Sequence, residues 1–452
     1  MHRANGVKNC SYTIDTYSNQ KQMLKLSKEK RKTLYFFMVL LIIFVVLFRR
    51  NIYIRFLFFV YDCIALFGLR KDWSPEYCSE EINGFTPVMP LEYYADFNKA
   101  IYPRVYSGNN EINKQKVIEI CDRNLQWLEK NGEPVSAAEQ IPILDYDDSE
   151  TQSKVLSYIE KKVPFVIRNF HMNVHDNLKL DKLMEISKDD KVYMSPSGEK
   201  CKEHVFAPLK ELRERGCYVT NSTNLFHKYP DLFSKEDLSK LESYVNHILH
   251  CDSQQLFIGL QKGQGTQLHA AYTNNFFFMI QGEKKWSFFN PNQLALLYPN
   301  FVKSGIYMAS ESRFLNGDEF DYKRFPLLKY AHRYETILKE GDLLYNPKSW
   351  FHAVYNMTEP SVACSTRWSK GFFHDIPDTR MLRYGNLTNT HLRDYVTELY
   401  VNTGHLGIEQ IDEHKHLIGT HDPNTIPLWD KETNASQKIC KKEDACEKHW
   451  HT

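Results

Sequence analysis

The stretch that decides the fold covers residues 265–286 and reads "GTQLHAAYTNNFFFMIQGEKKW". His269 lies in a strand-like run, an aromatic run follows from Asn275, and Lys284 comes fifteen residues after His269. Short apolar and aromatic runs separated by turn-forming residues are typical of β-strands. The stretch therefore predicts consecutive short strands that carry a histidine and a basic residue.

The same pattern of short strand-like runs continues on both sides of this stretch. Further short runs are "VPFVIRNF" (163–170), "QQLFIGL" (254–260), "KWSFFNP" (285–291), "GDLLYNP" (341–347) and "PSVACSTRW" (360–368). Helical patterns precede and follow them, for example from Val117 to Leu128, where apolar residues recur at helical spacing. The pattern predicts a mainly β fold, an antiparallel double-sheet barrel with helices outside.

The N-terminal part of the chain has a different character. "LYFFMVLLIIFVVLF" (34–48) contains no charged residue and is followed by Arg49 and Arg50. At about 1.5 Å per residue it is shorter than a ~30 Å hydrocarbon core, but flanking basic side chains can extend it by snorkelling. We expect a transmembrane anchor. The alternatives are a buried core helix and a secretory signal, although arginines rather than small residues follow the run.

A second apolar run, "FLFFVYDCIALFGL" (56–69), is interrupted by Asp62. We expect it to lie in the membrane interface or to extend the first helix, and a two-pass hairpin is the alternative. Six basic residues lie in 21–32 and three in 49–55, and the more basic flank usually stays cytosolic. The sequence thus predicts a single-pass type II protein, with its large domain in the lumen of the endoplasmic reticulum or Golgi.

The chain of 452 residues is predicted to contain several segments. They are a cytosolic tail (1–32), the anchor (33–50), the second apolar segment (51–71), a linker and helical region (72–138), the barrel domain (139–380) and a helical and polar tail (381–452). The formal net charge is +1, so no overall basic field exists to hold nucleic acid, and we expect no nucleic-acid partner.

A second histidine, His352, lies in "GDLLYNPKSWFHAVYN" (341–356). Taken alone, each histidine is more often a packed or surface residue than a metal ligand. Both, however, occur within one order of features: strand, histidine, strand, basic residue, Gly-Asp turn, strand, histidine. This order makes a shared site the better interpretation.

Residues from about 140 to 375 resemble the JmjC/cupin-like family of Fe(II)- and 2-oxoglutarate-dependent oxygenases, and in particular the asparaginyl hydroxylase group of the hypoxia response. The family's "PVVIRG" corresponds to "PFVIRN" here. Its Thr-x-x-His, Asn, Gly-x-Lys and Phe-x-Pro positions correspond in step to Thr266, His269, Asn275, Gly282, Lys284 and "FFNP". Its Gly-Asp-x-Leu-x-x-Pro-x-x-Trp-x-His strand is complete from Gly341 to His352.

The resemblance implies a double-stranded β-helix of the jelly-roll or cupin kind. It also implies that His269 and His352 are iron ligands and that Lys284 pairs with the distal carboxylate of 2-oxoglutarate. Thr266 and Asn275 would hydrogen-bond this cosubstrate, with Trp368 in a supporting place. Imidazole suits Fe(II), and a buried dicarboxylate needs a cation and hydrogen-bond donors.

One position departs from the family. The third metal ligand should be a carboxylate two residues after the first histidine, on the same strand face, but the chain has Ala271 there. Three interpretations follow: a halogenase-type enzyme with halide in the vacated position, a hydroxylase with two histidines and a water, or a non-catalytic binding domain. The retained cosubstrate residues favour the active ones. The neutral charge and the membrane segment disfavour chromatin demethylation, and the substrate is left open between a protein and a small molecule.

Overall fold

The computed structural model describes residues 86–101, 114–197, 200–202, 205–271, 273–301, 308–312 and 320–369. The chain divides into two compact units, residues 1–71 and 72–452, and every described residue belongs to the second unit. The predicted anchor, the second apolar segment and both tails lie outside the described residues. Within the described ranges, no helix has the length and apolar character needed to cross a membrane.

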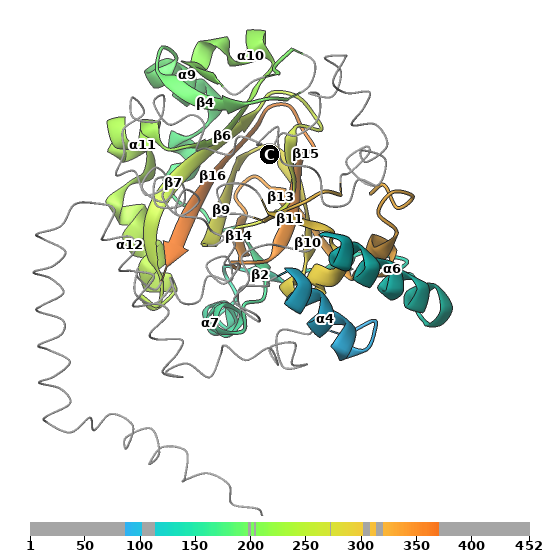
Figure 1. Ribbon diagram of the computed structural model, residues 1–452. Helices are drawn as coiled ribbons and strands as arrows, with labels where there is room; N and C mark the ends of the chain where they lie inside the picture. The colour runs from blue at the N-terminus through green and yellow to red at the C-terminus, as the bar shows by residue number, and fades with distance from the viewer. Residues whose placement is uncertain are drawn as a thin grey trace, which may run out of the picture. The chain divides into compact units, whose positions relative to one another are not determined.

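Two β-sheets form the centre of this unit (Figure 1). The first has seven strands in the order β1-β13-β10-β15-β8-β12-β11. Their bounds are Glu139–Gln140 (β1), Arg333–Lys339 (β13), Glu283–Phe289 (β10), Phe351–Asn356 (β15), Gly265–Ala270 (β8), Met308–Ser310 (β12) and Pro299–Phe301 (β11). β1 pairs with β13 in parallel, and the other strand pairs described in this sheet are antiparallel.

The second sheet has nine strands in the order β2-β3-β14-β9-β16-β7-β6-β4-β5. Their bounds are Ile143–Asp145 (β2), Phe165–Arg168 (β3), Leu343–Asn346 (β14), Asn274–Gln281 (β9), Ser361–Ser369 (β16), His250–Gly259 (β7), Tyr218–Ser222 (β6), Lys191–Ser195 (β4) and Val205–Pro208 (β5). Together the two sheets confirm the predicted mainly β fold with flanking helices.

Side-chain alternation along the strands gives the barrel an interior shared by both sheets. Phe277 and Met279 of β9 lie in one apolar cluster with Trp286 and Phe288 of β10 and with Val354 of β15. The alternate residues of β9, namely Phe276, Phe278 and Ile280, face outward and are also buried, under helices. Burial on both faces explains why "NFFFMIQG" is a continuous apolar run and not an alternating one. The residues on the inward-facing side of each strand, such as Phe277 and Met279, are therefore the ones that face a common site.

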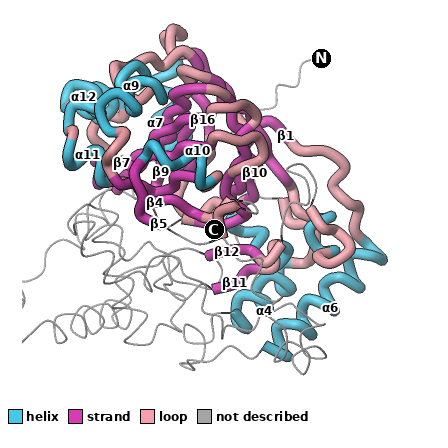
Figure 2. Tube along the Cα trace, turned by 90° about the horizontal axis from the view of Figure 1, so that it is seen from above, coloured by secondary structure: helices cyan, strands magenta, loops and turns pink. Residues whose placement is uncertain are grey.

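Helices cover the outer faces of the two sheets on opposite sides (Figures 1 and 2). Helices α4 (Leu91–Ile101) and α6 (Lys114–Asn131) share a buried cluster with the outer faces of β8 and β15. The outer face of the second sheet packs with the segments α7 (Thr151–Lys161), α8 (Val174–Asn177), α9 (Leu180–Ser187), α10 (Leu212–Arg215), α11 (Asn224–Lys228) and α12 (Lys235–Tyr244). The helix predicted from Val117 to Leu128 is confirmed as part of α6.

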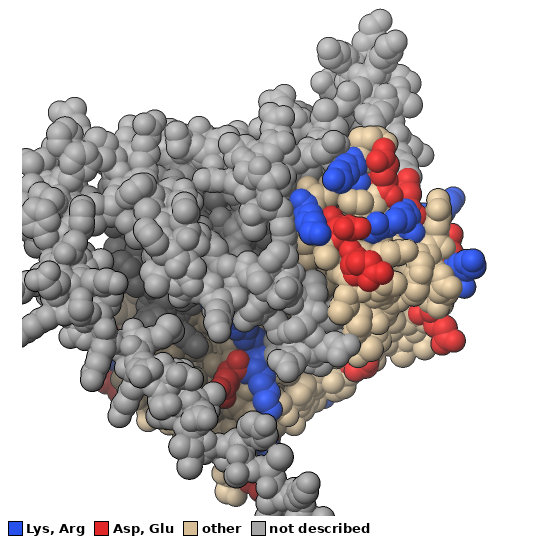
Figure 3. All heavy atoms as spheres, turned by 60° about the horizontal axis from the view of Figure 1, so that its bottom comes forward, with Lys and Arg blue, Asp and Glu red and all other residues tan. Residues whose placement is uncertain are grey.

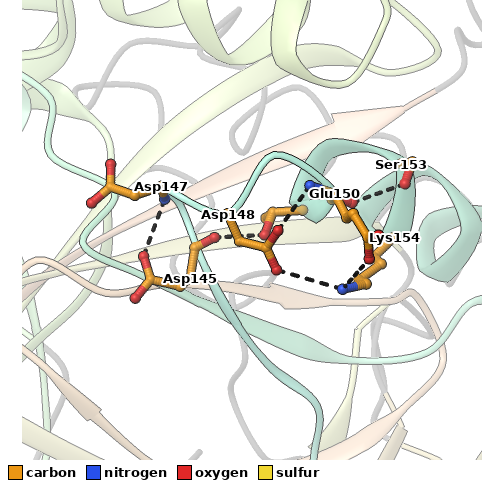
Figure 4. A network of polar contacts seen from close by, with 7 residues as sticks. Asp145, Asp147, Asp148, Glu150, Ser153 and Lys154 are labelled. Atoms are coloured by element: carbon orange, nitrogen blue, oxygen red, sulfur yellow. Dashed lines mark hydrogen bonds and ion pairs between the residues drawn. The ribbon is translucent and has the colours of Figure 1, made fainter.

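The turn before α7 is held by an exposed polar network (Figure 4). The Asp148 carboxylate accepts a hydrogen bond of 2.9 Å from the backbone N–H of Glu150, and Lys154 Nζ lies 3.0 Å from a carboxylate oxygen of Glu150. On the face drawn in Figure 3, basic and acidic side chains of the described residues are interspersed. Both features are local surface structure and do not form a binding site. The site predicted from the sequence belongs to the barrel interior.

The Gly-Asp turn that leads into β14 is fixed by a buried ion pair. Asp342 is 3% exposed, and its carboxylate pairs with Arg168 at the end of β3 and accepts from the backbone N–H of Lys339 at 2.6 Å. Burial raises the pKa of Asp342, although these partners oppose the rise. Gly341 has φ +87°, and a side chain there would meet His171. The turn therefore has a structural role: it sets the course of β14 and of the strand that carries His352.

Candidate functional site

His269 and His352 lie beside each other at the centre of the first sheet. β8 and β15 are antiparallel, and the two histidines are direct partners in their register. Their ring centroids are 4.3 Å apart, and the ring planes are inclined by 51°. The register therefore brings together two imidazoles that are 83 residues apart in the sequence (352 minus 269).

Each imidazole is oriented by a backbone carbonyl two residues earlier in the chain. His269 Nδ1 lies 2.8 Å from the carbonyl oxygen of Gln267, and His352 Nδ1 lies 2.9 Å from that of Trp350. A carbonyl only accepts, so these contacts assign the proton to Nδ1 and leave the lone pair on Nε2. Trp286 stacks on His352 with centroids 5.3 Å apart. Both rings are thus neutral, with the lone pair of Nε2 available to bind a metal, as in most metal-ligating histidines.

The pKa values agree with neutral imidazoles. Burial lowers the pKa of His269 to about 4. Burial, followed by the nearby charge of His269, lowers the pKa of His352 well below its ordinary value. Both rings are therefore unprotonated at neutral pH, which metal ligation requires.

Ala271 follows β8 directly, and its carbonyl accepts a hydrogen bond of 2.8 Å from the backbone N–H of Ser349. Its methyl side chain cannot bind a metal. The described ranges contain no group of three or more His, Cys, Asp or Glu side chains that could hold a metal ion. The donor set fits an iron ion in part, with two imidazole nitrogens in place and the carboxylate missing.

Lys284 of β10 is fully buried on the inner face of the barrel. Its Nζ donates to the Asn356 side-chain oxygen and lies 3.4 Å from the Tyr218 hydroxyl. Both partners are neutral, and burial lowers the lysine pKa to about 7. Burial also raises the pKa of Tyr218, so that its hydroxyl stays protonated. A buried lysine with neutral partners fits the carboxylate of an organic anion, since the charge of such a ligand would favour the protonated form of the amine.

The remaining residues predicted from the sequence fall on different faces. Asn275 is buried, shares the inner parity of β9 and accepts from the Ser365 hydroxyl at 2.7 Å. Thr266 lies in β8 with Val354 as its register partner. Trp368 instead packs in the outer cluster, with its indole N–H donating to the Thr366 hydroxyl at 2.7 Å. The structure thus brings Asn275 to the interior with the histidines and Lys284, and places Trp368 behind the sheet.

Sequence reasoning missed several polar residues of the interior. Tyr218 and Asn356 contact Lys284, and Arg367 Nε donates to the Gln255 side-chain oxygen at 2.7 Å. Asn346 is 1% exposed, and its Nδ2 lies 3.1 Å from His352 Nδ1. Asn356 also begins an Asn-x-Thr sequon, but its side chain is buried against Lys284. A sequence signal existed for Asn356 alone, which lies four residues after His352 on the same strand and on the same face.

Comparison with known proteins places this geometry in a family. Residues 151–374 match the family model described as the cupin-like domain. They form a cupin-like domain of the JmjC type. The predicted resemblance to the JmjC/cupin-like family is confirmed.

Three relatives illustrate the range of proteins that share this cupin-like domain. The chain is 27% identical over 238 residues to tRNA wybutosine-synthesizing protein 5 of Mus musculus, covering 50% of this chain and 64% of the relative. It is 27% identical over 139 residues to Arginine-specific demethylase JMJ20 of Arabidopsis thaliana (30% and 28%). It is 31% identical over 115 residues to HSPB1-associated protein 1 of Homo sapiens (25% and 22%). The matched region thus spans less than two thirds of each relative.

We predict that Lys284 gives the cupin-like domain a distinct pH dependence. Between pH 7 and 10.5 the unfolded chain holds a lysine proton that the folded protein has lost, so the unfolded state binds more protons. The free energy of unfolding should therefore rise with pH in this window, by up to ~1.4 kcal/mol per unit. Urea unfolding of the full chain at pH 7 and pH 9 measures the rise.

Lys284→Met should lack this rise. The matched control is Lys285→Met, because Lys285 is the next residue of β10 and its Nζ lies 3.3 Å from Glu335. An identical pH dependence in the parent and in Lys284→Met would contradict the assignment.

Proposed function

We propose that this protein is an Fe(II)- and 2-oxoglutarate-dependent oxygenase with an incomplete metal triad. The JmjC class to which its domain belongs uses this metal and cosubstrate. The observation that carries the proposal is the buried Lys284, whose partners are both neutral and which lies on the strand next to His352. A packing role would not account for a buried amine that is still partly protonated near pH 7 and whose two hydrogen-bond partners are neutral.

The proposal gives each interior residue a task. His269 and His352 would hold Fe(II) through Nε2, and the iron with its cosubstrate would supply the oxidising chemistry. Lys284, Tyr218 and Asn356 would bind the distal carboxylate of 2-oxoglutarate. The apolar walls formed by residues such as Trp286 and Phe288 exclude water, which strengthens the ionic contact to the lysine.

The position that Ala271 leaves open decides which version of this chemistry operates. A halide there would make the protein a halogenase-type enzyme, whereas a water would leave a hydroxylase with two protein ligands. Chloride dependence separates the two versions, because a halide ligand would couple chloride binding to iron binding.

A catalytically inactive binding domain is the second candidate. It is favoured by one observation: within the described ranges, no third His, Cys, Asp or Glu joins the histidines in a metal-binding group. In this version the lysine would still bind an organic acid, but iron would be absent.

The location and substrate of the protein are also proposals. A lumenal domain anchored by residues 33–50 is supported by the disulfide between Cys201 and Cys217, because disulfides persist in oxidising compartments. The relatives include a protein named for tRNA wybutosine synthesis and one named an arginine-specific demethylase. A net charge of +1 does not favour nucleic acid here, and we propose a protein or small-molecule substrate.

The first test of this function restores the missing carboxylate. Ala271→Asp should bind Fe(II) more tightly than the parent, on the order of tenfold or more, because a charged oxygen replaces an exchangeable ligand. Anaerobic Fe(II) titration in the presence of 2-oxoglutarate, with and without chloride, measures the change. The parent should lose iron on substitution of either histidine by alanine.

Chloride should tighten iron binding in the parent and not in Ala271→Asp if the halogenase version is correct. Iron binding that ignores chloride would leave the two-histidine hydroxylase. A folded parent that takes up no iron at any chloride concentration would overturn both versions and support the inactive binding domain.

The second test concerns topology. The basic flank at residues 21–32 should keep the N-terminus cytosolic, so protease added to sealed microsomes should spare the large domain. Addition of detergent should then permit digestion and serves as the control. Degradation of the large domain without detergent would reverse the proposed orientation.

A further inference from the structure

Asn221 faces solvent although both of its neighbours on β6 are buried. Thr220 is 3% exposed and Ser222 is 2% exposed, whereas Asn221 is an exposed residue. Val219, which lies two residues earlier, is fully buried in the cluster that packs under the helices. An outward position on this strand therefore does not by itself explain why Asn221 is exposed.

A β-bulge explains the exposure. Between the register pair Val219–Ile258 and the next pair at Ser222, β6 has two residues (220 and 221) and β7 has one (257). Asn221 is one of the two and has φ 50°, a left-handed conformation that asparagine adopts more readily than most other side chains. Bulges re-aim a side chain, and this one directs the Asn221 carboxamide away from the packed face of the sheet.

Asn221 also begins the sequence Asn221-Ser222-Thr223, which has the Asn-x-Thr pattern of an acceptor for N-linked sugar. An N-linked glycan is bulky and polar, so a folded domain can carry one only where the asparagine reaches solvent. The exposed bulge meets this requirement.

The other sequon in the described part of the domain is in the opposite situation. Asn356 is 1% exposed, its Oδ1 accepts from Lys284, and its Nδ2 lies 3.4 Å from the carbonyl oxygen of Gln261. A sugar on Nδ2 would break both contacts and has no room in the packed interior. The fold therefore separates two sequons that look equivalent in the sequence.

We propose that Asn221 carries an N-linked glycan. In the transfer, Asn221 Nδ2 forms a bond to the anomeric carbon of an oligosaccharide held on a lipid diphosphate. The bond from that carbon to the diphosphate oxygen breaks, the lipid diphosphate leaves with the electron pair, and one amide proton is released. The inference rests on the lumenal location proposed above, since the modification is made on chains that enter the secretory pathway.

The start of β6 supports the same compartment. The strand begins at Tyr218, directly after Cys217, and Cys217 forms a disulfide with Cys201. Disulfides persist in oxidising compartments such as the lumen of the endoplasmic reticulum. One short strand thus has a disulfide before its first residue and an exposed acceptor asparagine near its last.

The test expresses the full chain in cells that make glycoproteins, with Asn9→Gln, Asn386→Gln and Asn434→Gln, because these three residues also begin sequons. The readout is electrophoretic mobility before and after treatment with a peptide-N-glycosidase. We expect one glycosidase-sensitive step in this background and none when Asn221→Gln is added.

Two substitutions at Thr223 provide a matched pair. Thr223→Ser retains the acceptor pattern and should retain the glycan, whereas Thr223→Val removes the hydroxyl and should lose it. Valine keeps the shape of the side chain, and the Thr223 side chain makes no capping hydrogen bond to α11. A glycan on both variants, or on neither, would contradict the assignment to this sequon.

Mass spectrometry distinguishes the two sequons directly. Glycosidase treatment in water enriched in heavy oxygen converts a glycosylated asparagine to a labelled aspartate. The label should appear at Asn221 in the folded protein and be absent at Asn356. A label at Asn356 and none at Asn221 would overturn the inference.

The outcomes also separate this inference from the proposals on which it rests. An unmodified Asn221 in a large domain that microsomes protect from protease would overturn the glycan and leave the lumenal location. An unmodified chain whose large domain is digested without detergent would overturn both. The oxygenase proposal is independent, because Asn221 lies outside the barrel interior, and Asn221→Gln should bind Fe(II) and 2-oxoglutarate like the parent.

Discussion

A protonated lysine with no exposed surface costs free energy unless a negative charge meets it. Lys284 is in this position near neutral pH: burial lowers its pKa to about 7, so part of the population keeps the proton, and Asn356 and Tyr218 accept its hydrogen bonds but carry no charge. Two sheets maintain this unfavourable arrangement. The inward-facing side chains of both sheets surround the lysine, and helices cover the outer faces. The cost is a reason to expect a ligand, because an organic carboxylate would turn the buried charge into a stabilising contact.

The histidine pair depends on the same packing. β8 and β15 must be in one register for His269 and His352 to be partners, and the Gly-Asp turn with its Arg168–Asp342 pair sets the path toward β15. Each imidazole is then oriented by the carbonyl two residues before it. Under the proposed function these histidines would be two of the three metal ligands of the family, and a halide, a water or nothing would take the third position beside Ala271.

Much of this site could be predicted from the sequence because its motifs are local. His269, Asn275 and Lys284 lie in short runs that follow one another in the sequence, and the family motifs assigned their roles together. Tyr218 and Arg367 could not be found in this way, because their strands join the site through tertiary pairing. A register irregularity also falls between Arg367 and Trp368, so a pattern alone did not tell which of the two faces inward. The pairing of Cys201 with Cys217 was equally unreadable, since eight cysteines beyond the apolar region allow many pairings.

We propose that the two histidines and the buried lysine hold Fe(II) and 2-oxoglutarate together. Anaerobic absorption spectroscopy tests it most directly, because 2-oxoglutarate chelated to Fe(II) gives a visible charge-transfer band that neither component gives alone. We expect the full chain to develop this band only when both are added, and His269→Ala and Lys284→Met each to abolish it. A folded parent protein that shows no band with both components present would contradict the account.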